Sequence, residues 1–98
     1  MNNVKFSSIK MGKIIEKHFP TSSSKGVQQV ANLVLVTGKT YITDTNVVAK
    51  VATFKGQTFV LLLKPADYAS NKAAAITFYR DTSGSVAKRI ARKQWKAA

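Results

Sequence analysis

The feature that most limits how this chain can fold is a stretch of period-two hydrophobicity through its centre. Apolar and polar residues alternate over Thr40–Thr45, Val47–Phe54 and Thr58–Lys64, and β-branched and aromatic residues are frequent there. Such alternation is typical of strands with one buried face. Lys55-Gly56-Gln57 is short enough to join the last two segments tightly. The pattern predicts an antiparallel sheet whose strands follow one another along the chain.

A further strand is predicted on each side of this stretch. Residues 27–36 fit a helix by the spacing of their apolar positions, and a buried strand by the run Leu33–Val36. Gly38-Lys39 favours a strand from about Val30, because glycine in the first position suits a type II′ hairpin turn. Beyond the fourth strand, residues 66–72 are predicted to be a loop or a single helical turn, and Ala73–Arg80 a fifth strand.

A helix with one apolar and one basic side is predicted at each end of the chain. Over Ser8–Phe19, apolar residues recur at helical spacing, and Pro20 ends the helix. Residues 21–26 are a linker or turn whose hydroxyls could also cap a following helix. Over Ser85–Ala98, a serine cap precedes a basic amphipathic segment. The predicted fold class is α+β: an N-terminal helix, an antiparallel meander of four to five strands and a C-terminal basic amphipathic helix, in a single domain spanning residues 1–98.

The charge balance points to a polyanionic partner. Sixteen Lys and Arg face only four Asp and Glu, giving a net charge of +12, so ion pairs within the chain neutralise at most a quarter of the cations. Nucleic acid is the commonest extended anion for such a chain. The cations that the two helical patterns gather are the predicted phosphate contacts: Lys10, Lys13, Lys17, Lys88, Arg89, Arg92, Lys93 and Lys96.

Aromatic residues in the predicted strands favour single-stranded DNA or RNA as the ligand. Tyr41 and Tyr79 tolerate both a core edge and a binding surface, so we predict that they stack on bases. The phenylalanines are expected in the core, and Trp95 is expected to anchor its helix to the sheet. Because most of the cations are lysine, phosphate contact is favoured over base readout, and only weak sequence preference is expected.

Catalysis, metals and cofactors are not predicted. The four carboxylates lie far apart in the sequence, and the chain has no cysteine and a single histidine, His18, which the pattern places on an apolar helix side. Thr37-Gly38-Lys39-Thr40 ends like a phosphate-binding loop but lacks the glycine that such a loop needs further upstream.

The apolar strands Val47–Val51 and Phe59–Leu63 favour a homodimer or a larger assembly, because a small monomer does not easily cover them. Two other function classes fit the charge: a structural component of a ribonucleoprotein or viral particle, and a protein of anionic membrane surfaces. A membrane partner is not expected, since the apolar helix sides are poor in large residues. The expected location is intracellular, in the cytoplasm, the nucleoid or a virion, without secretion.

Overall fold

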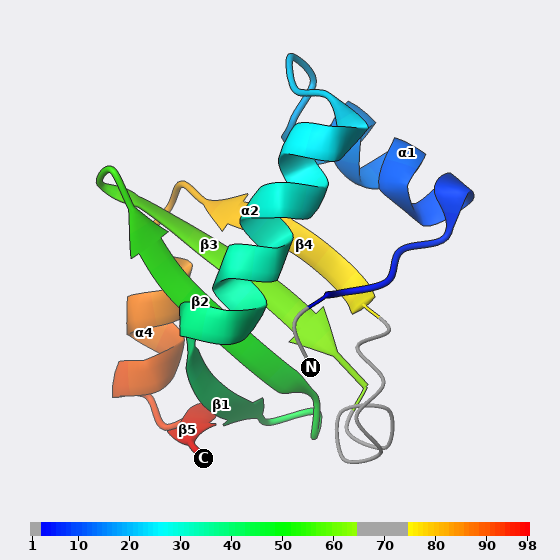
Figure 1. Cartoon of the computed structure of the whole chain (residues 1–98). Coiled ribbons are helices and arrows are strands. Elements are labelled where there is room, and N and C mark those ends of the chain that lie inside the picture. Colours follow the sequence, from blue (N-terminus) through cyan, green and yellow to red (C-terminus); the bar gives the residue numbers. More distant parts are fainter. Residues whose placement is uncertain (1–2, 65–74) are drawn as a thin grey trace.

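The computed structural model describes residues 3–64 and 75–98, and over these residues it confirms the predicted α+β class (Figure 1). Three helices and a five-stranded antiparallel sheet are present in the described part of the chain. In chain order the elements are α1 (Ser8–His18), α2 (Ser24–Thr37), β1 (Lys39–Thr43), β2 (Val48–Phe54), β3 (Gln57–Leu63), β4 (Ala75–Asp81), α4 (Ser85–Ala91) and β5 (Trp95–Ala97).

The sheet has the order β4-β3-β2-β1-β5, so its first four strands form the predicted meander. The predicted tight connection between β2 and β3 is confirmed, because Lys55 and Gly56 both have left-handed φ values, 52° and 75°. This conformation is typical of a two-residue hairpin turn. The predicted strands agree with β1 to β4 within about two residues at each end. The predicted loop or turn at 66–72 lies outside the described residues.

The predicted strand from Val30 is wrong, because this segment is the second half of α2. The Ser23 hydroxyl accepts a hydrogen bond from the Gly26 amide at 3.1 Å, which is the alternative capping role of the serine-rich linker. Four apolar residues at helical spacing then bury one side of α2: Val27, Ala31, Val34 and Leu35. Gly38 follows the helix because a Cβ there would lie 2.5 Å from the Val34 carbonyl oxygen. The glycine therefore serves a close approach and not a hairpin turn.

The predicted C-terminal helix is right only for its first half. It ends at Ala91, Lys93 has a left-handed φ of 59°, and Trp95–Ala97 forms β5. This strand pairs with the free edge of β1, with Trp95 opposite Thr43, and the pairing outweighs helix propensity at the chain end. The predicted serine cap is also wrong: the N-cap is Gly84, with no side-chain bond.

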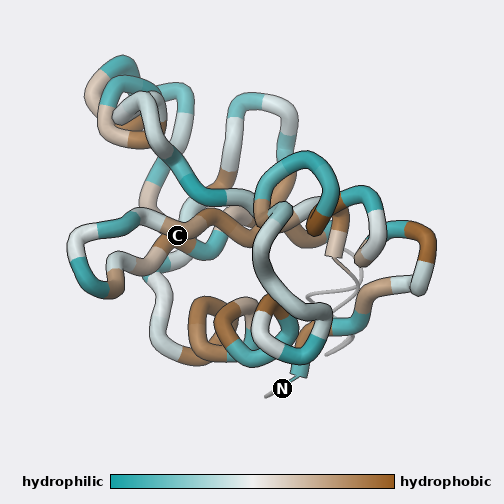
Figure 2. Tube along the Cα trace, turned by 90° about the horizontal axis from the view of Figure 1, so that it is seen from above, coloured by the Kyte–Doolittle hydropathy of each residue, from teal (hydrophilic) through white to brown (hydrophobic). Residues whose placement is uncertain are grey.

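Helices cover both faces of the sheet, which gives the molecule three layers (Figure 2). The face under α1 and α2, here called the α1/α2 face, carries the larger core cluster, including Leu61, Leu63 and Phe78. The opposite α4 face carries a smaller cluster built on Ala49, Val60, Val86 and Trp95. Phe78 and Tyr79 belong to different clusters, as strand alternation predicts for neighbours in sequence.

Candidate nucleic-acid interface

The basic side of α1 forms one wall of an open hollow. Ser7 caps the helix by accepting a hydrogen bond from the Lys10 amide at 3.1 Å. Lys10, Lys13 and Lys17 then follow one another about one turn apart, and with Thr77 of the edge strand β4 they line a hollow of about 350 Å³. The predicted cluster of three lysines on α1 is therefore brought together at the edge of the sheet.

The three lysines differ in how freely they can bind. The Lys10 ammonium donates a hydrogen bond of 2.8 Å to the Ala75 carbonyl oxygen, which holds this side chain against the start of β4. Lys13 and Lys17 are exposed. Phosphate contact from α1 therefore falls mainly to Lys13 and Lys17.

Tyr79 lies between α1 and α4. Its ring centroid is 5.9 Å from that of His18, which is the last residue of α1. Burial raises the pKa of the half-buried Tyr79 phenol, while the charge of Arg89 and its hydrogen bond act in the opposite direction. The pKa of His18 is lowered by burial and by the charge of Lys17, and both favour the neutral imidazole.

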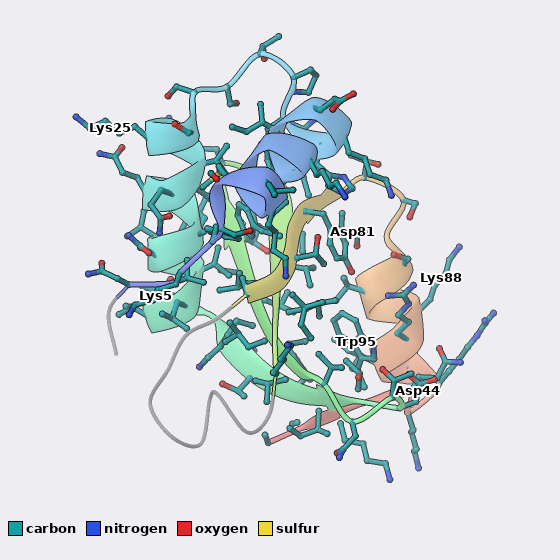
Figure 3. The ribbon with its side chains drawn as sticks, turned by 90° about the vertical axis from the view of Figure 1, so that its right-hand side faces the viewer. Lys5, Lys25, Asp44, Asp81, Lys88 and Trp95 are labelled. Atoms are coloured by element: carbon teal, nitrogen blue, oxygen red, sulfur yellow. The ribbon has the colours of Figure 1, made fainter. Side chains whose placement is uncertain are left out.

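On α4, Arg89 is held by two aromatic neighbours. Its guanidinium lies 5.5 Å from the ring centroid of Trp95, a cation–π distance, and it also reaches Tyr79. Lys88, Arg92 and Lys93 are exposed, and Lys88 extends away from the molecule in Figure 3. His18, Tyr79, Arg89 and Trp95 thus connect the basic side of α1 to α4 through direct neighbours.

The start of α4 depends on Asp81. Its carboxylate accepts hydrogen bonds from the Val86 amide at 3.1 Å and from the Ser85 hydroxyl at 3.1 Å. Burial alone would raise the pKa of Asp81, but the hydrogen bonds from Val86, Ser85 and Ser83 lower it. Asp81 therefore supports the position of the α4 cations and does not present a carboxylate to a ligand.

Two predicted site residues, Lys96 and Tyr41, do not lie beside Tyr79. Lys96 alternates with Trp95 along β5 and pairs with Ile42, so it belongs to the α1/α2 face. The cations predicted to share one side of the C-terminal helix, Lys88 to Lys96, are therefore divided, because that helix ends at Ala91. Tyr41 is half-buried on β1, with its ring 6.5 Å from Trp95, and β2 and β3 separate it from Tyr79.

The sequence did not single out Thr77 or the proximity of His18 to Tyr79. Both follow from the packing of α1 beside β4, two elements that lie more than fifty residues apart in the chain. The apolar spacing of α1 predicted that His18 faces protein, but it contains no signal for which strand it meets.

Comparisons with protein-family models, with curated proteins and with solved structures found no match. Over residues 3–64 and 75–98, no helix is long and apolar enough to cross a membrane.

Proposed function

We propose that this chain is a non-enzymatic nucleic-acid-binding protein that favours single-stranded DNA or RNA with weak sequence preference. The observation that carries the proposal is the junction at Tyr79. Helix α1 reaches this ring through His18, and α4 reaches it through Arg89. Exposed cations lie on α1, on α4 and directly after α4: Lys13, Lys17, Lys88, Arg92 and Lys93.

This combination suits a single strand. Proteins that bind single strands combine cations along the backbone with aromatic rings that stack on bases, each worth about 1–3 kcal/mol. Tyr79 is half-buried, so part of this residue remains accessible to a ligand. Every base has a π-face, and phosphate contacts carry no sequence information. Weak sequence preference follows from both.

Duplex recognition through the major groove fits less well. Helix α4 has seven residues, which is about 10 Å of helix at 1.5 Å per residue. One side of it carries Val86 and Ile90, which pack on the sheet. Little of the helix is left to read base edges in a groove.

The test compares variants that each remove two positive charges. Binding of a fluorescent mixed-sequence single-stranded oligonucleotide is measured by anisotropy at several salt concentrations. K13A/K17A removes two cations of α1, and K88A/R92A removes Lys88 of α4 and Arg92, which directly follows this helix. Each pair is expected to lower affinity and to flatten the slope of log K against log salt by about 1.4, since single strands contribute about 0.7 per phosphate contact.

The matched control is K5A/K25A, which removes the same charge from the side of α2, away from Lys88 (Figure 3). It is expected to change the slope by less than half as much. Equal effects of all three variants would mean that only diffuse net charge acts, and absence of binding at low salt would overturn the proposal. A duplex of the same sequence is expected to bind more weakly than the single strand.

An assembly of several chains remains a separate proposal. The strands that motivated it are covered within one chain, because Ala49, Phe59, Val60 and Leu61 are buried by the protein's own helices. Leu33 and Val36 on the outer side of α2 are the alternative apolar contact, at 52% and 57% exposed. Light scattering on a sizing column tests whether the chains assemble, since a single species of 10.7 kDa would exclude an assembly.

A further inference from the structure

A second hollow lies at the end of the α4 face where β1 and β5 meet. Its volume is about 390 Å³, near the lower end of the range of about 300–1,000 Å³ for ligand pockets. Val47, Leu62 and Trp95 contribute apolar surface to it. Polar groups come from the β1–β2 connection and from the end of α4: Thr43, Asp44, Thr45, Arg89 and Gln94.

The fold holds these polar groups in place. Thr43 pairs with Trp95 across β1 and β5, which brings the connection after β1 beside the turn before β5. The Thr43 hydroxyl accepts a hydrogen bond from the Val47 amide at 3.0 Å and contacts the Thr45 hydroxyl at 3.1 Å. The backbone amide of Gln94 donates a hydrogen bond of 2.9 Å to the backbone carbonyl oxygen of Arg89. Both sides of the hollow are thus closed by short, hydrogen-bonded turns.

Asp44 is the notable group in this lining. It is an exposed carboxylate in a chain that carries sixteen cations and four acids, and Figure 3 places it near Trp95 at the end of α4. A carboxylate only accepts hydrogen bonds. The side-chain amide of Gln94 both donates and accepts them, and the Arg89 guanidinium donates them. A planar ligand with an N–H edge toward Asp44 would satisfy all three groups above an apolar floor.

We propose that this hollow binds one base of the nucleic acid and prefers bases with an amino group. The inference rests on the proposed function and deepens it, because it adds a base preference at one position of the strand. Cytosine and adenine offer an amino N–H that a carboxylate accepts. Uracil and thymine present carbonyl oxygens on both sides of their single ring N–H, and these oxygens repel a carboxylate.

The test measures the affinity ratio between a 15-residue oligo(dC) and a 15-residue oligo(dT). The natural protein is expected to bind oligo(dC) about five- to tenfold more tightly, the lower end of what one well-formed polar base contact contributes. In D44N the side-chain amide offers both a donor and an acceptor. The affinity for oligo(dC) is then expected to exceed that for oligo(dT) by a factor of no more than about two. Trp95 is the only tryptophan, so its fluorescence should change more with oligo(dC) than with oligo(dT).

The matched control is E16Q, which removes the same charge from an exposed position of α1. It is expected to raise affinity for both oligonucleotides slightly and to leave their ratio unchanged. A ratio of one in the natural protein, or a D44N ratio equal to that of the E16Q control, would overturn the base pocket while salt-dependent binding kept the proposed function intact. Failure to bind either oligonucleotide at low salt would overturn the proposed function first and the pocket with it.

Discussion

The two faces of the sheet come from the same strands, yet they are covered very differently. Helices of eleven and fourteen residues cover the α1/α2 face, where Phe19, Phe59 and Phe78 stack with ring centroids 5.4–6.4 Å apart. A helix of seven residues covers the α4 face, where Tyr41 and Tyr79 remain half-buried.

The difference separates stability from binding. A fully buried ring stabilises the fold but cannot contact a ligand, whereas a half-buried tyrosine does some of both. The short cover of the α4 face leaves Arg89, Tyr79 and the hollow beside Trp95 within reach of solvent. We therefore expect substitutions of side chains buried on the α1/α2 face to change mainly stability and those of half-buried or exposed side chains on the α4 face to change mainly binding.

The strongest test of this division uses two neighbours in sequence. Phe78 is fully buried on the α1/α2 face, and F78A is expected to lower the free energy of unfolding by about 3–5 kcal/mol. Tyr79 is half-buried on the α4 face, and Y79A is expected to lower it by about 1–2 kcal/mol. Urea denaturation measures both values.

If F78A fails to fold, F78L keeps most of the apolar volume and is expected to lose less than about 1.5 kcal/mol. Equal losses in F78A and Y79A would contradict the division. In binding, the order reverses: Y79A weakens the oligonucleotide complex, and F78L leaves it unchanged.

A middle-sized effect is expected at Asp81, which fixes the start of α4. D81A removes the hydrogen bonds to Ser85 and Val86 and is expected to lower stability at pH 7 by about 0.5–2 kcal/mol. Because the pKa of Asp81 is lowered in the folded state, its contribution is complete above about pH 4 and is lost as the pH falls further.

Urea midpoints at pH 7 and pH 3 test this prediction, because the gap between the natural protein and D81A should be smaller at pH 3 than at pH 7. The exposed Asp44 provides the control, and D44A should leave the pH 7 midpoint unchanged. A gap that stays constant across this range would show that the carboxylate charge is not what caps α4.

The smallest effect is expected at His18, where α1 meets Tyr79. The pKa of this imidazole is lowered, so the unfolded chain binds more protons than the folded one near pH 6. Stability should therefore decrease as the pH falls from 7.5 to 5.5, through the ordinary value of about 6.5. H18Q should be less sensitive over this range, and urea midpoints at the two pH values measure the difference. An identical pH response in both proteins would show that His18 is not the source of this pH dependence.

Local patterns predicted much of the fold correctly. Two features could be predicted because they depend only on neighbours in sequence. They are the alternation in β2 and β3 and the turn at Lys55 and Gly56. Helix α2 could not be predicted, because its apolar run suits a buried strand as well as a helix side. Ser23 and Gly38 contain the deciding information, but a serine and a glycine occur in many turns.

The candidate site was predictable in part. The cations of α1 were grouped correctly, since helical spacing alone brings Lys10, Lys13 and Lys17 together. Lys96 was grouped wrongly, because it lies in β5, which pairs with a β1 edge that only the assembled sheet creates. The hollow with Asp44 could not be predicted, since its two sides are about fifty residues apart.

The amino-acid sequence alone determined the surplus of positive charge, the class of the fold and which residues of β1 to β4 share a face, because composition and short-range periodicity set them. Tertiary structure decided which helices meet which face, where the last helix gives way to a strand, and which cations lie near Tyr79. These outcomes depend on contacts between segments that are distant in the sequence. Such contacts form only when the sheet has assembled and its apolar faces become covered by helices.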